Sequence, residues 1–180
     1  MKPSTTTIPT DLEELVSLKN GRIVATFINA LPPRGGDLHG TSVEFFFEEG
    51  GSCSIDGLIV DVAPKEEVYL LHFGKAMELD VWQNRLQAGI GKSAIETVDL
   101  HPAWSEQGLE PLLAGPREVR FYRSAVSEGA VGEESTFEAI QLYVPGMEDA
   151  QSLFLSASQD FPGDVVVTVG IPTTEFSLAG

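Results

Sequence analysis

Short apolar runs, each ended by turn residues, recur along this chain from Arg22 onward, and they limit the folds open to it. Val43, Phe45 and Phe47 alternate with glutamates, which is typical of a strand with one buried face. Gly50 and Gly51 follow, and glycines readily supply the positive φ angles of a hairpin turn. The pattern therefore predicts antiparallel strands joined by short connections.

The same pattern continues to the end of the chain. We expect further strands at 23–31, 53–62, 68–73, 95–100, 119–126, 137–144, 153–157 and 165–171. Strands and helices do not alternate, which argues against a parallel doubly wound sheet. We predict a mainly β fold, with α+β as the alternative. Its architecture would be an antiparallel β-sandwich or a strongly curved sheet with one or two short covering helices.

Two segments carry helix signals. Thr10 and Glu13 have the spacing of a capping box, and Leu12, Leu15 and Val16 then form an apolar face. A second short helix is expected over 102–113. A third segment, 76–86, is ambiguous. Its alternation favours a strand, while a helix is the alternative.

Length and composition favour one folded unit. The chain has 180 residues, of which 42% are hydrophobic, enough to bury a core without a disulfide or metal. We expect a flexible tail over 1–9 and a single globular domain over 10–180. No apolar run is long enough to span a bilayer or to act as a secretory signal. Cys53 is the single cysteine, so the chain cannot form an internal disulfide, and a reducing compartment is expected. We therefore expect a cytoplasmic protein of bacterial origin.

The charge is the most unusual feature of the composition. Acidic residues number 27 and basic residues 11, for a net charge of −16. Such a field repels nucleic acid and anionic membranes, because both are bound through Lys and Arg. It attracts basic proteins, although solubility alone is the simpler explanation of the charge. We therefore expect neither nucleic acid nor membrane as a direct partner.

No catalytic or metal-binding motif is found. Residues 88–93 resemble a phosphate-binding loop, but Leu86 stands where that loop requires glycine, so we expect a surface loop there. Asp99 and His101 would share a strand face, yet two ligands cannot close a zinc site. Structural roles are favoured for the histidines His39, His72 and His101. Cys53 has no C-x-x-C partner, and the sequence does not identify the histidine base that a catalytic cysteine would need, so we expect a buried small residue. We expect no cofactor and no metal.

Paired acidic residues supply the candidate binding surface. They recur at Glu13-Glu14, Glu48-Glu49, Glu66-Glu67, Glu133-Glu134 and Glu148-Asp149, where exposure to water also explains them.

Phe46 and Trp82 fall on the polar faces of their expected strands, next to Glu48 and Asp80. If exposed, they would form an aromatic anchor inside an acidic rim, as at many protein interfaces. The predicted binding residues are Phe46, Glu48, Glu49, Glu66, Glu67, Asp80 and Trp82.

Three arginines cluster at Arg117, Arg120 and Arg123. In so acidic a chain we expect them to pair with carboxylates, with a carboxylate or phosphate ligand as the alternative.

The leading interpretation is a non-enzymatic binding module that engages a basic protein, such as an immunity protein or an inhibitor. It rests on size, charge and expected location rather than on a motif. One alternative is a small-ligand carrier or enzyme with a pocket in the curved sheet, using His72, Arg120 and Tyr122. Another is a structural or assembly subunit joined through exposed strand edges. The oligomeric state stays open.

Overall fold

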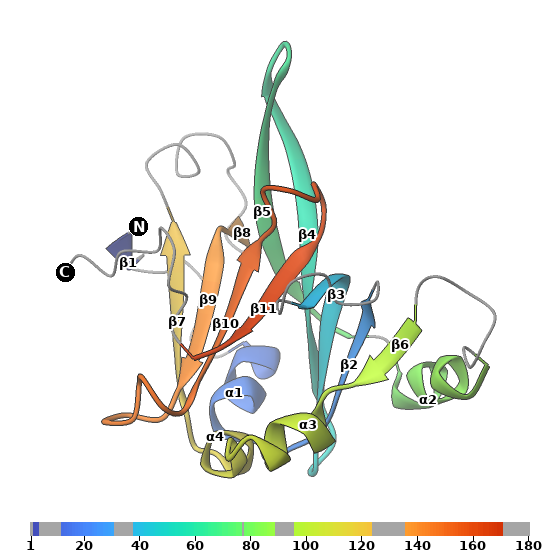
Figure 1. Ribbon diagram of the computed structural model, residues 1–180, viewed down its shortest axis with the longest axis vertical. Helices are drawn as coiled ribbons and strands as arrows, with labels where there is room; N and C mark the ends of the chain where they lie inside the picture. The colour runs from blue at the N-terminus through green and yellow to red at the C-terminus, as the bar shows by residue number, and fades with distance from the viewer. Residues whose placement is uncertain are drawn as a thin grey trace.

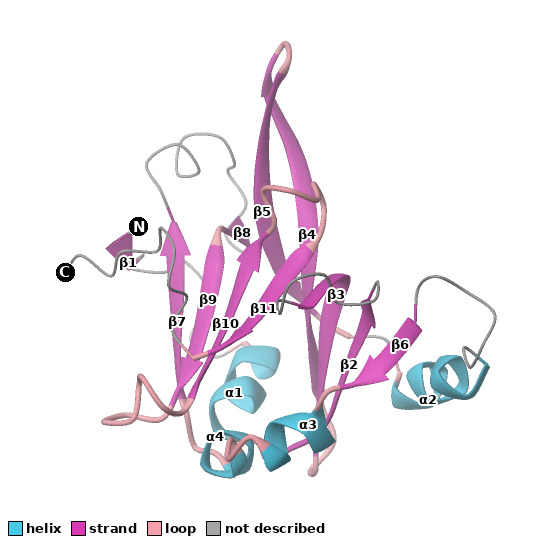
Figure 2. Cartoon of the chain, viewed as in Figure 1, coloured by secondary structure: helices cyan, strands magenta, loops and turns pink. Residues whose placement is uncertain are grey.

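The computed structural model describes residues 2–3, 12–30, 38–76, 78–88, 96–123 and 136–170. Within them, strands predominate over short helices (Figure 2), and every strand pair is antiparallel. The predicted mainly β, antiparallel fold is confirmed. No helix in this part of the chain is long and apolar enough to cross a membrane.

The elements fall into two groups. The strands are β1 (Lys2–Pro3), β2 (Ile23–Ala30), β3 (Leu38–Phe47), β4 (Ser52–Ala63), β5 (Glu66–Gly74), β6 (Glu96–Asp99), β7 (Glu118–Arg123), β8 (Thr136–Phe137), β9 (Ala139–Tyr143), β10 (Ser152–Ala157) and β11 (Val165–Val169). The helices are α1 (Glu13–Asn20), α2 (Leu79–Ala88), α3 (His101–Glu106) and α4 (Glu110–Ala114).

The strands form one strongly curved sheet that nearly closes on itself (Figure 1). Its order is β1-β7-β9-β10-β11-β3-β4-β5-β8, and β2 and β6 extend it from the side of β3. Only Glu138 separates β8, which pairs with β5, from β9, which pairs with β10. The sheet curves back to this point, so the core lies inside it.

Three helices supply the remaining wall of the core. α1, α3 and α4 lie together at one end of the curved sheet (Figure 1), where Leu18, Trp104 and Leu113 join the main apolar cluster. The helix expected over 102–113 is present as two, because Gly108 interrupts it with a φ of 81°. Apolar side chains of α1, α3 and α4 thus close the end that strands leave open.

Within the segment 76–86, the residues from Leu79 onward form helix α2 rather than the strand that their alternation favoured. In α2 the side chain of Trp82 is fully buried and stacks on Phe27 with ring centroids 6.0 Å apart. Phe27 in turn meets Phe46 edge to face at 5.8 Å. α2 thus covers the outer face of β2 and β3, where it protects these aromatic rings from water. The local sequence was compatible with a strand or a helix, and the burial of Trp82 against Phe27 favours the helix.

The apolar face of α1 also differs from the prediction. Leu15 and Leu18 are buried, whereas Val16 is 42% exposed and points away from the core. Leu12 occupies the N-cap without a side-chain hydrogen bond. The predicted capping residue Thr10 lies outside the described residues.

Several predictions fall wholly or partly outside the described residues. Of the tail expected over 1–9, only Lys2 and Pro3 are described, and they pair with Arg123 and Tyr122 of β7. The strands expected at 119–126 and 165–171 are described as far as 123 and 169. The loop-like segment 88–93 is described only at its first residue.

A buried arginine ties the helical end to the sheet. Arg117, 2% exposed, donates hydrogen bonds to the carbonyl oxygens of Leu18, Gly21, Leu112 and Leu113. These carbonyls belong to the C-terminal ends of α1 and α4, which carry partial negative charge. Burial lowers the pKa of Arg117 to about 10, so the side chain stays charged at neutral pH. The expected pairing of Arg117 with a carboxylate is wrong, because helix-end carbonyls take that place.

β4 passes very close to the turn between β10 and β11. A Cβ atom added to Gly57 would lie 2.0 Å from the carbonyl oxygen of Gly163. Glycine is therefore required at Gly57 for a close backbone approach. This contact sets the point at which the β4–β5 hairpin leaves the body of the sheet and extends outward (Figure 1).

Replacing Arg117 tests whether its hydrogen bonds hold the ends of α1 and α4 against the sheet. We expect Arg117→Met to lower the free energy of unfolding by about 3 kcal/mol, because several buried carbonyls lose a charged donor. Arg117→Lys should recover less than half of the loss, since an ammonium group cannot reach both helix ends. Arg120→Met is the control and should cost less than about 1 kcal/mol. Urea unfolding measures all three, and equal losses at both positions would contradict the assignment.

Adding one methyl group at Gly57 tests the crossing. Gly57→Ala should cost about 3 kcal/mol or displace the β10–β11 turn, because the backbone contact leaves no space for Cβ. Gly50→Ala is the control for backbone strain alone. Gly50 has a φ of 82°, which is strained for alanine, but no atom lies within 4 Å of its Cβ position, so no steric contact is added. That variant should cost about 1 kcal/mol. Thermal unfolding of both proteins gives the comparison, and similar costs would argue against the close contact.

Candidate functional site

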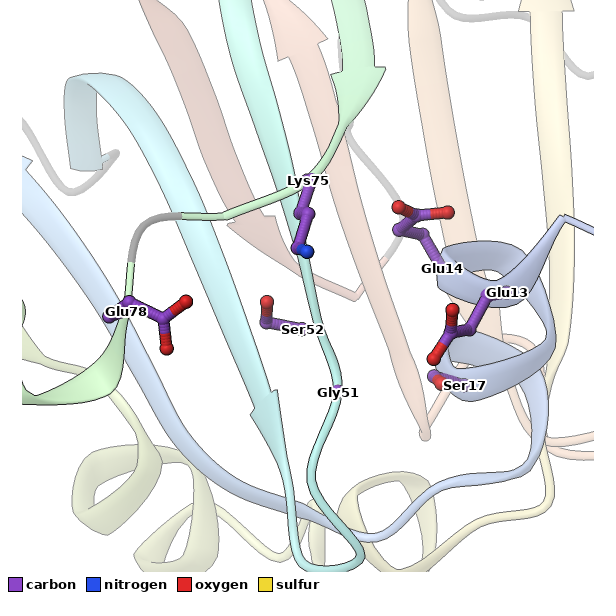
Figure 3. Close-up of a pocket in the computed structure, with 7 residues that line it drawn as sticks. All are labelled: Glu13, Glu14, Ser17, Gly51, Ser52, Lys75 and Glu78. Atoms are coloured by element: carbon purple, nitrogen blue, oxygen red, sulfur yellow. The ribbon is translucent and has the colours of Figure 1, made fainter.

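An acidic groove runs between α1 and the β3–β4 hairpin. It consists of two neighbouring cavities, of about 250 and 340 Å³, that share Glu13, Ser17 and Gly51. The smaller cavity extends toward the segment between β5 and α2 (Figure 3). The larger one follows the hairpin turn. The glutamates that line the groove are Glu13, Glu14, Glu48, Glu49 and Glu78.

Four of these glutamates are placed by local structure. Glu13 and Glu14 form the first turn of α1, where the positive end of the helix dipole favours acidic side chains. Glu48 and Glu49 lie in the turn between β3 and β4. The turn is closed by two glycines at positive φ, and the Gly50 amide donates to the Phe47 carbonyl at 3.1 Å. Helix start and hairpin turn thus face each other across the groove.

The fifth glutamate comes from the link between β5 and α2. Glu78 precedes α2, and Lys75 follows β5. Figure 3 shows the Lys75 side chain between Glu14 on one side and Glu78 on the other, above Ser52. The smaller cavity therefore offers carboxylates, hydroxyls and one ammonium group to a ligand.

The groove keeps a strong excess of negative charge. Arg22 lines the larger cavity, but its guanidinium is 2.6 Å from the carboxylate of Glu110, which balances its charge. Lys75 then stands against five glutamates. Ion pairs in the described part of the chain include Arg22–Glu110 and a 4.0 Å approach of His72 to Asp56. The groove is therefore suited to cations.

An apolar strip accompanies the acidic residues. The exposed side chain of Val16 and the edge of Phe47, itself 5% exposed, line the larger cavity between Glu13 and Glu48. Apolar surface beside carboxylates suits lysine and arginine side chains, because their hydrocarbon stems can pack on the apolar surface while their charged ends bind the carboxylates.

The predicted aromatic anchor is not exposed. Phe46 and Trp82 do lie in one cluster, but Phe46 is 5% and Trp82 0% exposed because α2 folds over that face of the sheet. Exposure was the condition for their role in binding, and it is not met. Both residues serve the packing of α2 on β2 and β3.

The predicted acidic residues separate into three places. Glu48 and Glu49 lie in the groove, whereas Glu66 and Glu67 begin β5 at the other end of the long strand β4. β4 has 12 residues, which span roughly 35 Å at the usual rise. Asp80 lies in the first turn of α2, where its carboxylate accepts from the backbone N–H of Val81 at 2.9 Å. The seven predicted residues thus do not form one surface.

The histidines and Asp99 have surroundings that fit structural roles. One carboxylate oxygen of Asp99 accepts from the backbone N–H groups of Thr26 at 3.2 Å and His101 at 3.0 Å, which joins β2 to the start of α3. His39 packs against the ring of Phe161 at 5.2 Å. In the described part of the chain, no group of three or more His, Cys, Asp or Glu side chains could hold a metal ion.

Of the residues in the alternative ligand pocket, Arg120 and Tyr122 lie two residues apart on β7, whereas His72 lies on β5, where its ring nitrogen is 4.0 Å from the carboxylate of Asp56. Arg120 lies 4.7 Å over the ring of Tyr143 and donates to its hydroxyl, rather than pairing directly with a carboxylate. The Tyr122 hydroxyl donates to the side chain of Gln141, the residue of β9 that pairs with Arg120. The side chain of Arg123 lies outside the described residues.

Sequence analysis missed part of the groove. The pair Glu13-Glu14 belongs to the paired acids of the candidate surface but not to the seven predicted binding residues, and only its position on α1 brings it opposite Glu48 and Glu49. No local signal pointed to Lys75 or Glu78, because the helix that follows them was expected to be a strand. Had the sequence indicated a helix at 79–88, Lys75 and Glu78 would have been expected in the connection between β5 and that helix.

Comparison with known proteins identifies no relatives. No protein-family model matches the chain, and neither a curated protein nor a solved structure is significantly similar to it.

Cys53 is inert in the folded protein. Its side chain is fully buried in the core, and burial strongly raises the pKa of the thiol, although the nearby charge of Arg117 offsets part of that effect. Because the thiolate is the reactive form, we expect no labelling by a thiol reagent at pH 8 in buffer. Labelling should become complete in denaturing urea. Rapid reaction of the native protein, followed by absorbance, would contradict the burial.

Proposed function

We propose that this chain is an acidic binding module that engages a basic protein in the cytoplasm through the groove between α1 and the β3–β4 hairpin. Functionally it would resemble an immunity protein or an inhibitor that covers a basic surface. The observation that carries the proposal is the gathering of five glutamates, from three separate segments, around two adjoining cavities.

The dimensions of the groove support recognition of basic side chains. At about 30 Å³ per non-hydrogen atom, each cavity has room for one lysine or arginine side chain. Carboxylates on both walls can accept from a guanidinium or ammonium group, and Val16 can contact its stem. Two such cavities side by side favour a partner with two neighbouring basic residues.

The charge of the whole chain supports the same proposal. A net charge of −16 speeds encounter with a basic protein and repels nucleic acid. Long-range attraction would bring the partner to the molecule, and the groove would fix its orientation. Affinity should then fall steeply as salt rises, because exposed charges are screened over about 10 Å at 0.1 M salt.

Matched sets of charge-neutralising substitutions test the groove. The groove variant is Glu13→Gln, Glu14→Gln, Glu48→Gln and Glu49→Gln. The control variant is Asp61→Asn, Glu66→Gln, Glu67→Gln and Asp80→Asn, which removes the same charge elsewhere. The probe is a short peptide of alternating arginine and serine, titrated by calorimetry at about 0.05 and 0.5 M salt.

The groove variant should bind the peptide at least about tenfold more weakly than the unaltered protein, whereas the control should change by less than about twofold. Equal losses in the two variants would mean that only net charge matters. That outcome, or an affinity independent of salt, would contradict a specific groove and leave solubility as the role of the charge.

A further inference from the structure

A second cavity of different chemistry lies between α3 and the end of β11. β11 pairs with β10 along its whole length, but with β3 only over Val165–Val167. Thr168 and Val169, the last two residues of β11, have no partner in the described part of β3. A cavity of about 300 Å³ lies at this point, with α3 as its other wall.

The described lining of this cavity is uncharged. Leu38, Leu100, Trp104, Val167 and Val169 supply apolar surface. The polar side chains are those of Gln107, which follows α3 as its C-cap, and Thr168 on β11, and Ala103 of α3 also lines the cavity. The cavity is partly open to solvent, and apolar side chains with one or two hydrogen-bonding groups are a usual lining of a small-molecule site.

The size of the cavity indicates the size of a ligand. The cavity has the volume of about ten non-hydrogen atoms at liquid density, and it is partly open to solvent. It lies between α3 and the last residues of β11, beyond the described pairing of β11 with β3.

We propose that this cavity binds a neutral, largely apolar molecule of about ten non-hydrogen atoms that carries one hydrogen-bonding group. The Thr168 hydroxyl and the Gln107 amide would hold the polar end, and the indole of Trp104 would contact the apolar body. An anion is disfavoured because no described lining residue is cationic and the chain carries a net charge of −16. A cation is disfavoured because no described lining residue offers a carboxylate.

This site is separate from the acidic groove. The two share no lining residue, so binding here stands or falls independently of the proposed protein partner. A bound molecule would contact β11, the start of β3 and α3 together. It would therefore stabilise the short pairing between β3 and β11, which spans three residues of β11.

The test uses 2-phenylethanol, with phenylacetate and 2-phenylethylammonium as charged analogues of similar shape. Binding is followed by amide chemical shifts of the full-length protein in NMR titrations. The neutral probe should saturate with a half-point at or below about 1 mM, within the efficiency of ordinary small ligands. Its largest shifts should fall on the α3 and β11 residues that line the cavity. The charged analogues should bind at least about tenfold more weakly.

Substitutions then locate the site. Ala103 is exposed on α3, so Ala103→Leu should fold normally, fill the cavity and weaken binding at least about tenfold. Thr168→Val keeps the shape but removes the hydroxyl, and should weaken binding about fivefold. Gln87→Leu, at an exposed position on α2, is the matched control and should leave binding unchanged.

Three results would overturn the proposal. They are no saturable shift with the neutral probe, shifts centred away from the cavity, and equal binding by phenylacetate. Unchanged affinity in Ala103→Leu would also exclude this cavity, even if the protein bound the probe elsewhere. Because the shift mapping uses the unaltered protein, the proposal stays testable if a variant fails to fold.

Discussion

The guanidinium group of Arg117 is the contact on which the helical end of this protein depends. It lies at the start of β7 and donates to the carbonyl-rich ends of α1 and α4, so one side chain joins sheet and helices. Its positive charge is balanced by peptide dipoles rather than by a carboxylate. A buried cation held in this way is stable only while both helix ends keep their positions. Arg117 therefore constrains where α1 can lie.

The position of α1 in turn determines the acidic groove. Glu13 and Glu14 begin the helix whose other end Arg117 holds, and the hairpin glutamates face them from the sheet. α2 contributes indirectly, because its packing through Trp82 directs the link that carries Lys75 and Glu78 toward the same place. The groove is thus a product of helix packing on a curved sheet, although most of its charges lie on turns and helix starts. Like charges so close together cost stability, which a strong core can offset.

The two proposed sites differ in physical character because they occupy different parts of the fold. The acidic groove lies at a solvent-exposed junction between α1 and a hairpin, where charged side chains keep their hydration until a partner arrives. The second cavity lies between α3 and the end of β11, where the described lining is uncharged and includes both buried side chains, such as Trp104, and exposed ones, such as Val169. One surface is suited to attraction over a distance and the other to contact with an uncharged ligand. Both adjoin the same curved sheet, one at the β3–β4 hairpin and the other at the end of β11.

The local pattern of residues by itself determined the class of fold and most of the strands. Period-two alternation and the Gly50-Gly51 hairpin are properties of neighbouring residues, so they can be predicted without knowing which elements pack together. The net charge likewise follows from composition and limits the partners. Tertiary structure decided everything that depends on residues distant in sequence. It made 79–88 a helix by burying Trp82, turned the expected aromatic anchor into core, and gave Arg117 carbonyl partners in place of carboxylates. It also separated Glu66 and Glu67 from Glu48 and Glu49 by the length of β4, because a strand places its two ends far apart however alike their sequences are.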